Sequence, residues 1–300
     1  RSREATMPTH HYADVNGVRL HYAAEGQGPL LMFVHGFPEF WYAWQGQLAE
    51  FGRDHFAVAP DMRGYNLSSK PAELDSYAVP LLVEDLVALA AHLGHRRFTL
   101  VAHDWGGAIA WATALLHPDR LERLVIVNAP HPAIFQRLLA EHPGQQKASQ
   151  YMLFFRSAEA EATLAADNFA VLRQMVLGEG QPWGWATEAD RTAYLEAWAQ
   201  PGALTGGLNF YRAARVGPPA PGEAPRHLAG DLSGWVVKVP TLVIWGERDT
   251  ALLPENLDGL DRVVSDLTIR RVANGTHWVA HEQPALVNRH IREFVAARPS

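Results

Sequence analysis

The stretch from Phe98 to Ala110, FTLVAHDWGGAIA, constrains the fold of this chain more than any other part of it. An apolar run from Phe98 to Ala102 is followed by a corner of mostly small residues and then by an alanine-rich amphipathic run. This pattern predicts a buried strand, a tight turn and a helix. The small neighbours permit a strained turn that lifts the side chain of Asp104 above the edge of a sheet.

Asp104 occupies the centre of this turn, with Ala102 and Gly106 two residues to either side. The small-x-nucleophile-x-small spacing is that of a nucleophile elbow, but here the central residue is Asp and not Ser or Cys. A carboxylate is ionised at neutral pH without help from a base, and it suits attack on an electrophilic sp³ carbon to give an alkyl ester. The sequence therefore favours Asp104 as a nucleophile and disfavours ordinary acyl transfer.

Apolar runs typical of strands alternate with helical patterns on both sides of the elbow. The pair Asn16-Gly17 between two alternating runs predicts an antiparallel hairpin near the start of the chain. The expected strands are Tyr12 to Val15, Val18 to Ala24, Leu30 to Val34, His55 to Ala59, Phe98 to Ala102, Leu124 to Val127, Pro240 to Trp245 and Leu267 to Val272. Leucines from Leu82 to Leu93 mark one face of a helix that Gly94 is placed to end. This rhythm predicts an α/β fold with a mostly parallel sheet.

The character of the sequence changes between about Ala133 and Trp235. This region contains aromatic residues, Gly and Pro clusters and helical patches, but no convincing strand. We therefore expect an α/β core interrupted by a mostly helical cap. Residues 1–132 form the first part of the core, 133–235 the cap, and 236–300 the second part of the core.

Composition excludes several classes of function. The net charge of −6 and the lack of a basic run disfavour a nucleic-acid partner. The chain has no Cys, and its 15 His form no HExxH pattern, so no metal and no other cofactor is expected. No apolar stretch approaches the roughly 20 residues that span a bilayer, and no membrane partner is expected. The first residues, RSREATMP, lack the apolar segment of a signal peptide, so we expect a cytoplasmic location.

Hydrolysis of an alkyl ester on Asp104 requires a water molecule activated by a base, which an acid orients. In open α/β sheets such groups lie at the carboxyl ends of strands. Asp249 and His277 follow the last two expected strands and are the expected acid and base, although each alone also fits an ordinary loop. Glu247 is the rival acid on the same turn as Asp249. Asn128 follows an earlier strand, but an amide cannot be the acid.

The segment His35-Gly36-Phe37-Pro38 closes a strand expected to lie beside the elbow strand. The backbone N–H groups of Phe37 and Trp105 are expected to form an oxyanion hole for ester hydrolysis. A simple turn is the other interpretation of this segment. Trp105 and Trp278 adjoin catalytic positions and are expected to contact substrate, although plain packing also explains them.

Over nearly its whole length the chain resembles the epoxide hydrolases of the α/β-hydrolase superfamily. The motifs are His35-Gly36-Phe37-Pro38-Glu39 with Trp41 and Trp44 downstream, Asp61-Met62-Arg63-Gly64-Tyr65, His103-Asp104-Trp105-Gly106-Gly107, Asn128-Ala129-Pro130-His131-Pro132, and the loops of Asp249 and His277. The order nucleophile, acid, His is also that of the superfamily's triad. The resemblance implies an α/β-hydrolase fold and an enzyme that converts a small-molecule epoxide and water to a vicinal diol. The alkyl ester would form on Asp104, and His277 would activate the water.

In that family two tyrosines of the cap donate hydrogen bonds to the epoxide oxygen. Tyr151, in Tyr151-Met152-Leu153-Phe154-Phe155, resembles the first. Tyr211, in Leu208-Asn209-Phe210-Tyr211-Arg212, resembles the second. A phenol with a pKa of about 10 keeps its proton at pH 7 and can protonate an alkoxide. Packing within the cap is the other interpretation of both residues, and it is the expected role of Tyr194.

Haloalkane dehalogenases share the same Asp-His-Asp machinery and remain an alternative. A departing halide needs N–H donors, and Phe37 stands where that family often places a donor-bearing side chain, while the Trp105 indole still offers one. Haloacetate dehalogenases, including those for fluoroacetate, place arginines after the nucleophile, where this chain has Trp105 and Ala108. A ligand-binding α/β-hydrolase-fold protein without catalysis is the third alternative. The sequence does not determine substrate breadth or oligomeric state.

Overall fold

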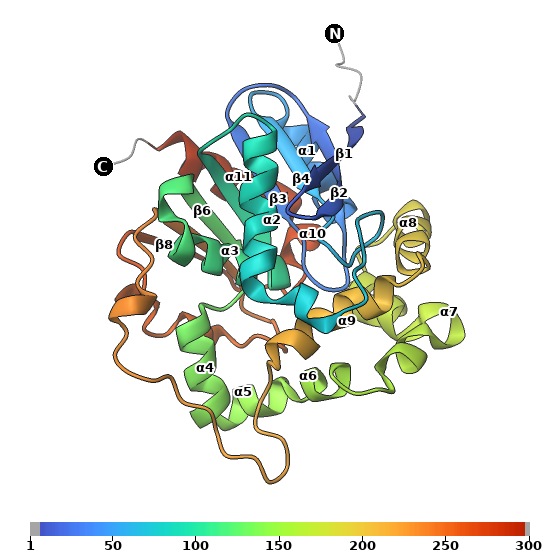
Figure 1. The fold of residues 1–300 in the computed structure, drawn as a ribbon, viewed down its shortest axis with the longest axis vertical. Coiled ribbons are helices and arrows are strands. Elements are labelled where there is room, and N and C mark those ends of the chain that lie inside the picture. The colour runs from blue at the N-terminus through green and yellow to red at the C-terminus, as the bar shows by residue number, and fades with distance from the viewer. Residues whose placement is uncertain (1–6, 298–300) are drawn as a thin grey trace.

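In the computed structural model, residues 7–297 form a twisted sheet with helices on both of its faces (Figure 1). The expectation that the chain begins without a signal peptide falls mainly on residues 1–6, which lie outside the described residues. Among the described helices, none is both long and apolar enough to cross a bilayer.

The sheet has eight strands in the order β1-β2-β4-β3-β5-β6-β7-β8. Their bounds are β1 (Thr9–Val15), β2 (Val18–Glu25), β3 (Leu30–Val34), β4 (Phe56–Pro60), β5 (Phe98–His103), β6 (Leu121–Val127), β7 (Thr241–Gly246) and β8 (Leu267–Val272). The pairs β1–β2 and β2–β4 are antiparallel, and all other pairs are parallel. Asn16 and Gly17 turn the first hairpin with φ of 51° and 75°, as a tight two-residue turn requires. The expected mostly parallel α/β architecture is confirmed.

Helices cover both faces of the sheet and its carboxyl-end edge. Their bounds are α1 (Gln45–Phe51), α2 (Val79–His92), α3 (Asp104–Leu116), α4 (Pro132–Glu141), α5 (Pro143–Ala148), α6 (Gln150–Phe155), α7 (Ala160–Leu177), α8 (Glu188–Trp198), α9 (Ala203–Ala214), α10 (Val279–Glu282) and α11 (Pro284–Ala296). Helices α4 to α9 lie between β6 and β7 in the chain; in Figure 1, α4 to α7 and α9 lie below the sheet and α8 lies to its right. They occupy most of the segment expected to form the cap, and the division at 132/133 and 235/236 stays a prediction.

Side chains of the central strands alternate between two buried layers. Leu100 of β5 packs in the layer that contains α2 and α3, whereas the next residue, Val101, packs in the layer that contains α1 and α11. This follows from the two-residue period of a strand. Because both faces are covered, the inner strands are continuous apolar runs and not alternating ones.

The turn between β5 and α3 is packed against the loop that follows β3. Asp104 has a φ of 52°, a left-handed conformation that is uncommon for a residue with a side chain. A Cβ atom on Gly106 would lie 2.3 Å from the carbonyl oxygen of His35. A Cβ atom on Gly36 would lie 2.3 Å from the Cβ of Asp104. Glycine at these two positions therefore permits the nucleophile turn and the β3 loop to touch.

We predict that Gly106→Ala destabilises the fold, because the new methyl group meets a backbone carbonyl that cannot rotate away. The expected loss is about 1–3 kcal/mol of unfolding free energy, typical of overpacking. Gly46→Ala is the matched control, because Gly46 lies near the start of α1 with nothing within 4 Å of its added Cβ. That control is expected to gain about 0.5–1 kcal/mol from helix propensity. Urea unfolding of both variants measures the difference, and equal stability of the two would contradict the close approach at the elbow.

Candidate active site

The carboxyl ends of four neighbouring strands bring the expected site residues together. Strands β5, β6, β7 and β8 are adjacent in the sheet. Asp104 directly follows β5, and Asn128 directly follows β6. Asp249 lies on the turn after β7, and His277 lies on the loop after β8. These residues converge because parallel strands that share a sheet end at the same edge.

A short hydrogen bond joins the expected acid to the expected base. The Nδ1 atom of His277 lies 2.6 Å from Oδ2 of Asp249. Asp249 is only 3% exposed, and its Oδ1 accepts the backbone N–H groups of Ala251 and Leu252, each at 2.8 Å. Among the described residues, His277 bonds through its ring to Asp249 and not to the rival carboxylate of Glu247. Nδ1 therefore carries a proton, which leaves Nε2 facing the nucleophile.

Asn128 holds the acid in place, a role that the sequence did not suggest. Its amide nitrogen donates to Oδ2 of Asp249 at 3.0 Å and to the carbonyl of Gly246 at 3.1 Å. Its amide oxygen accepts the N–H of Gly246 at 2.7 Å. The residue is fully buried and has a φ of 41°. The position of Asn128 in the sequence could have indicated this role, because a polar residue directly after a buried parallel strand lies at the same sheet edge as the other expected site residues.

The charge of His277 is set by the carboxylates around it. Burial lowers the pKa of this imidazole, but the negative charges of Asp249, Asp104 and Glu39 outweigh burial and raise the pKa to about 9. Nε2 of His277 lies 3.5 Å from Oδ2 of Asp104. Burial opposes ionisation of Asp249, yet the charge and hydrogen bond of His277 lower its pKa below the usual value. The resting site therefore holds an imidazolium between two carboxylates at neutral pH.

Oδ1 of Asp104 lies at the expected oxyanion hole. The backbone N–H of Phe37 donates to Oδ1 of Asp104 at 2.9 Å. Trp105 is the second residue of α3, and the first N–H groups of a helix have no intrahelical acceptor. Phe37 therefore supplies a backbone donor to the Asp104 carboxylate, as an oxyanion hole requires, and the part of Trp105 stays a prediction.

A second buried carboxylate, Glu39, lies behind the base. Its Oε1 accepts the hydroxyl of Tyr194 at 2.7 Å and lies 2.5 Å from Nε2 of His281. Its Oε2 lies 3.4 Å from Nδ1 of His103, whose Nε2 lies 2.8 Å from the carbonyl oxygen of His277. Burial opposes its ionisation, but His281 and His103 hold the pKa of Glu39 well below the usual range. This network connects helix α8 to the backbone of the base, and nothing in local spacing predicted it.

The two expected cap tyrosines lie together on the cap side of the nucleophile. Tyr211, on α9, packs edge-on against the rings of Phe37 and Trp105, each with a centroid separation of 5.3 Å. The rings of Tyr151 and Tyr211 are 6.4 Å apart. Burial, followed by the charge of Asp104, raises the pKa of both phenols well above the usual value. Both hydroxyl groups therefore keep their protons at neutral pH.

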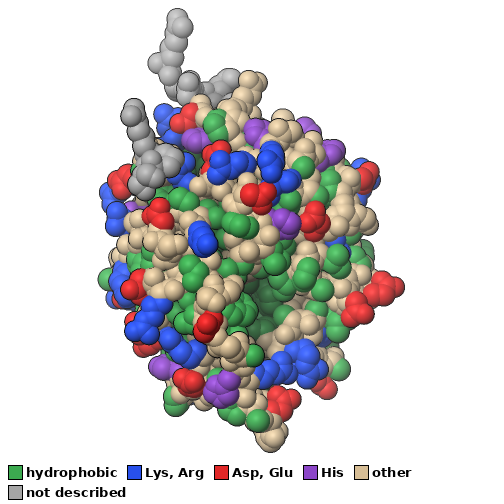
Figure 2. Space-filling view, turned by 60° about the vertical axis from the view of Figure 1, so that its left-hand side comes forward, with side chains coloured by type: hydrophobic (Ala, Val, Ile, Leu, Met, Phe, Trp, Pro, Cys, Tyr) green, Lys and Arg blue, Asp and Glu red, His purple; other side chains and the backbone are tan. Residues whose placement is uncertain are grey.

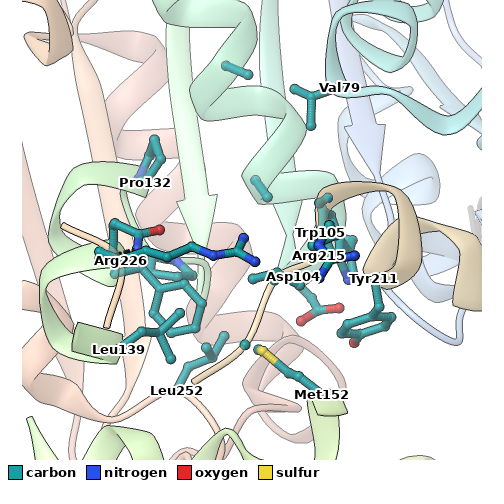
Figure 3. Close-up of a pocket in the computed structure, with 18 of the residues that line it drawn as sticks. Val79, Asp104, Trp105, Pro132, Leu139, Met152, Tyr211, Arg215, Arg226 and Leu252 are labelled. Carbon is teal, nitrogen blue, oxygen red and sulfur yellow. Dashed lines mark hydrogen bonds between the residues drawn. The ribbon is translucent and has the colours of Figure 1, made fainter. Parts of the chain in front are cut away.

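A cavity of about 550 Å³ begins at the nucleophile. Asp104, Trp105 and Tyr211 line it together with Met152 and Leu252 (Figure 3). This size is within the usual range for small-molecule sites. Trp105 thus takes the expected place in the wall.

Trp278 packs instead beside the base. Its ring contacts those of His277 and His103, at centroid separations of 4.8 and 5.9 Å. Its contact with substrate stays a prediction. Within residues 7–297, no group of three or more His, Cys, Asp or Glu could hold a metal ion.

Comparison with known proteins identifies the family. A family model described as alpha/beta hydrolase fold matches residues 29–284. AB hydrolase superfamily protein YfhM of Bacillus subtilis (strain 168) is 36% identical over 95% of this chain and 96% of its own length. Epoxide hydrolase 4 of Mus musculus is 34% identical over 97% of this chain and 81% of its own length.

Solved structures agree with the sequence relatives. A variant of the Bacillus megaterium epoxide hydrolase, in complex with its naphthyloxy-propane-1,2-diol product, superimposes with a TM-score of 0.89 and 38% identity. The match covers 96% of this chain and 100% of that one. The chain therefore belongs to the epoxide hydrolases of the α/β-hydrolase superfamily.

Proposed function

We propose that this chain hydrolyses epoxides to vicinal diols in two steps, through an alkyl ester on Asp104. One observation carries the proposal. The charge of Asp104 helps to raise the pKa of two cap phenols, those of Tyr151 and Tyr211. The same carboxylate lies 3.5 Å from Nε2 of His277, which Asp249 orients. The diol held by the Bacillus megaterium relative supports the same product class.

In the first step, an oxygen of Asp104 attacks an epoxide carbon and the ring C–O bond breaks. The ring oxygen becomes an alkoxide, which takes a proton from Tyr151 or Tyr211. A raised phenol pKa weakens each tyrosine as an acid in the resting state. However, formation of the ester removes the negative charge of Asp104, which helps to raise both pKa values. Proton transfer therefore becomes easier as the C–O bond to Asp104 forms.

In the second step, the imidazolium of His277 first passes its proton through water to the tyrosinate. The neutral His277 then takes a proton from a water molecule, and the hydroxide adds to the ester carbonyl carbon. The resulting oxyanion is stabilised by the N–H groups of Phe37 and Trp105. Collapse releases the second diol oxygen and restores Asp104 as a carboxylate after proton transfer to the leaving alkoxide. His277 ends the cycle protonated, as in the resting site. The net reaction is one epoxide plus one water to one diol.

The same electrostatics switch His277 from acid to base. In the resting site its pKa of about 9 keeps it protonated at pH 7. Ester formation removes the charge of Asp104, one of the groups that raise this pKa. His277 therefore loses its proton more readily when the ester is present, which is when a base is needed.

Halide displacement is the alternative chemistry of this machinery. A departing halide takes no proton, so two phenols on the cap side of the nucleophile would have no chemical task. Their position supports an epoxide oxygen as the leaving group. Measuring diol and halide separately across panels of epoxides and haloalkanes tests this choice.

We predict that His277→Gln accumulates a covalent enzyme after mixing with styrene oxide. Ring opening needs Asp104 and the tyrosines, whereas ester hydrolysis needs the base. Mass spectrometry of the quenched protein should show an increase by the full mass of the epoxide, because nothing leaves. The control Asp104→Ala/His277→Gln should show no adduct. Full turnover by Asp104→Ala would instead mean that water attacks the epoxide directly.

We predict that Tyr211→Phe and Tyr151→Phe each slow alkylation. Loss of one charge-assisted hydrogen bond to the alkoxide costs roughly 1.5–3 kcal/mol, or about 10- to 150-fold in rate. The double replacement should be nearly inactive towards epoxides, whereas hydrolysis of a preformed ester should change little. Tyr12→Phe is the control, because Tyr12 is 46% exposed on β1. Stopped-flow tryptophan fluorescence measures alkylation, and a double variant with the wild-type rate would rule out this role.

We predict that Asp104→Asn lowers the pKa of His277 from its resting value of about 9. Removing a negative charge 3.5 Å from Nε2 favours the neutral imidazole. His277 of the variant should therefore lose its proton at a lower pH than His277 of the wild type. Titration of the ring ¹⁵N signals by NMR measures both values. Asp119→Asn is the control, since Asp119 lies after α3 with 62% of its side chain exposed. An unchanged His277 pKa in Asp104→Asn would contradict the coupling between nucleophile and base.

A further inference from the structure

The cavity extends far beyond the nucleophile along one face of α3. Besides Asp104 at one end, the helix contributes Ala108, Ala112, Leu115 and Leu116 to the wall. Residues at every third or fourth position share one face of a helix. At 1.5 Å per residue, residues 104 and 116 are roughly 18 Å apart along the axis. Leu116 is 56% exposed, so this end of the cavity lies at the surface.

The facing wall is also apolar, which leaves few charges in contact with a bound molecule. Pro132, Phe135 and Leu139 contribute from α4, and Trp235 from the segment before β7. On the face shown in Figure 2, a hollow lined by hydrophobic side chains has Lys or Arg side chains near its lower edge. The body of a bound substrate is therefore expected to be apolar.

Apart from Asp104, the charged side chains among the described residues that line this cavity are both arginines, Arg215 and Arg226. Arg215 follows Tyr211 by about one helical turn and caps the carboxyl end of α9. Arg226 comes from the segment between α9 and β7, and its guanidinium points into the cavity on the side where Asp104 lies (Figure 3). Two positive groups from separate segments therefore converge on one apolar cavity.

A third arginine completes this group, which we call the arginine cluster (Arg156, Arg215 and Arg226). All three line a small hollow next to the main cavity, together with Glu223. The side chain of Arg156 donates to the carbonyl of Arg215 at 3.3 Å. The side chain of Gln136 donates to the carbonyl of Arg226 at 2.6 Å. The backbones that carry both cavity-lining arginines are thus tethered, while their guanidinium groups are not used in these bonds.

The positive charge of the arginine cluster is not neutralised by salt bridges within the described part of the chain, where none of the three forms one. Partial burial, followed by the charges of Arg215 and Arg226 with Glu223 opposing, lowers the pKa of Arg156. The three neighbouring cations repel one another, and the single carboxylate of Glu223 offsets only part of this repulsion. Binding of an anion would therefore stabilise the arginine cluster.

We propose that Arg226 and Arg215 form a carboxylate subsite of the catalytic cavity, and that the preferred substrates are epoxides with a carboxylate at the end of an apolar arm. This proposal rests on the proposed function. The epoxide lies between Asp104 and Tyr211, the arm lies on the apolar walls, and the carboxylate meets a guanidinium. A planar guanidinium matches a carboxylate by two parallel hydrogen bonds. A neutral epoxide would form no ion pair with these arginines.

The test compares matched substrates that differ only in charge. Terminal epoxides with short, medium and long methylene arms are used as the free carboxylate and as the methyl ester. The quantity measured is the ratio of kcat/KM for the acid to that for the ester. Wild-type enzyme is compared with Arg226→Gln, Arg226→Lys, Arg215→Gln and the double Gln variant. Arg289→Gln on α11 is the control, since 64% of that side chain is exposed.

We predict that wild-type enzyme prefers the acid for at least one arm length. Each single Gln variant should lower the ratio by about 2- to 5-fold, as expected for exposed ion pairs, and the double variant by about 5- to 20-fold. Arg226→Lys should retain part of the preference, Arg289→Gln all of it, and turnover of the ester should change little throughout. Added NaCl should reduce the preference, because salt screens exposed charges.

The outcomes separate the two proposals. Turnover of the ester with no preference for the acid, or an unchanged ratio in the double Gln variant, overturns the carboxylate subsite and leaves epoxide hydrolysis intact. Equal losses for acid and ester overturn it as well, because they indicate general damage to the cavity. Absence of diol from every substrate overturns both proposals. Inhibition by the diol products gives a test that does not depend on epoxide turnover. The subsite would be supported if the diol acid inhibits the wild-type enzyme competitively, the diol ester does not, and the double Gln variant loses this inhibition.

Discussion

The contact between the strained turn at Asp104 and the loop after β3 is the constraint on which the rest of the site depends. Gly36 and Gly106 allow backbone segments from β3 and β5 to approach at distances that a methyl group would prevent. The approach places the N–H of Phe37 at 2.9 Å from the Asp104 carboxylate. One packing contact therefore holds the Asp104 side chain above the sheet and supplies a donor to it. The positive φ of Asp104 is tolerated because both flanking elements are buried.

Charge balance is the second organising principle of the site. Buried carboxylates are costly unless they are paired, and here the partners are histidines held by backbone and amide groups. Asn128 donates to the acid without adding charge, which an Asp at this position could not do. With Asp104 also nearby, His277 titrates at a pKa of about 9 in the resting site. Loss of the Asp104 charge would therefore lower the pKa of His277, because this charge is one of the groups that raise it.

The cap segment supplies phenol groups and apolar surface to the site at the sheet edge. The helices between β6 and β7 bring two phenols and an apolar surface over an anionic sheet edge. The hydroxyl of Tyr194 bonds to Glu39 and the indole of Trp198 donates to the carbonyl of Pro38 at 2.7 Å, so α8 is fixed to the loop after β3. The same loop therefore contacts the nucleophile on one side and the cap on the other. This loop therefore joins the turn at Asp104 to helix α8.

The sequence by itself determined the strand and helix pattern, the hairpin at Asn16-Gly17 and the elbow at Asp104, because these depend on periodicity and on turn residues close together in the chain. It also narrowed the acid and base to residues after particular strands. Only the tertiary structure decided the contact between Asn128 and Asp249, which are 121 residues apart, and the network around Glu39. The convergence of the arginine cluster was likewise invisible, because its members lie on different loops and helices. Local spacing predicts elements, but only packing decides which polar groups from distant elements meet.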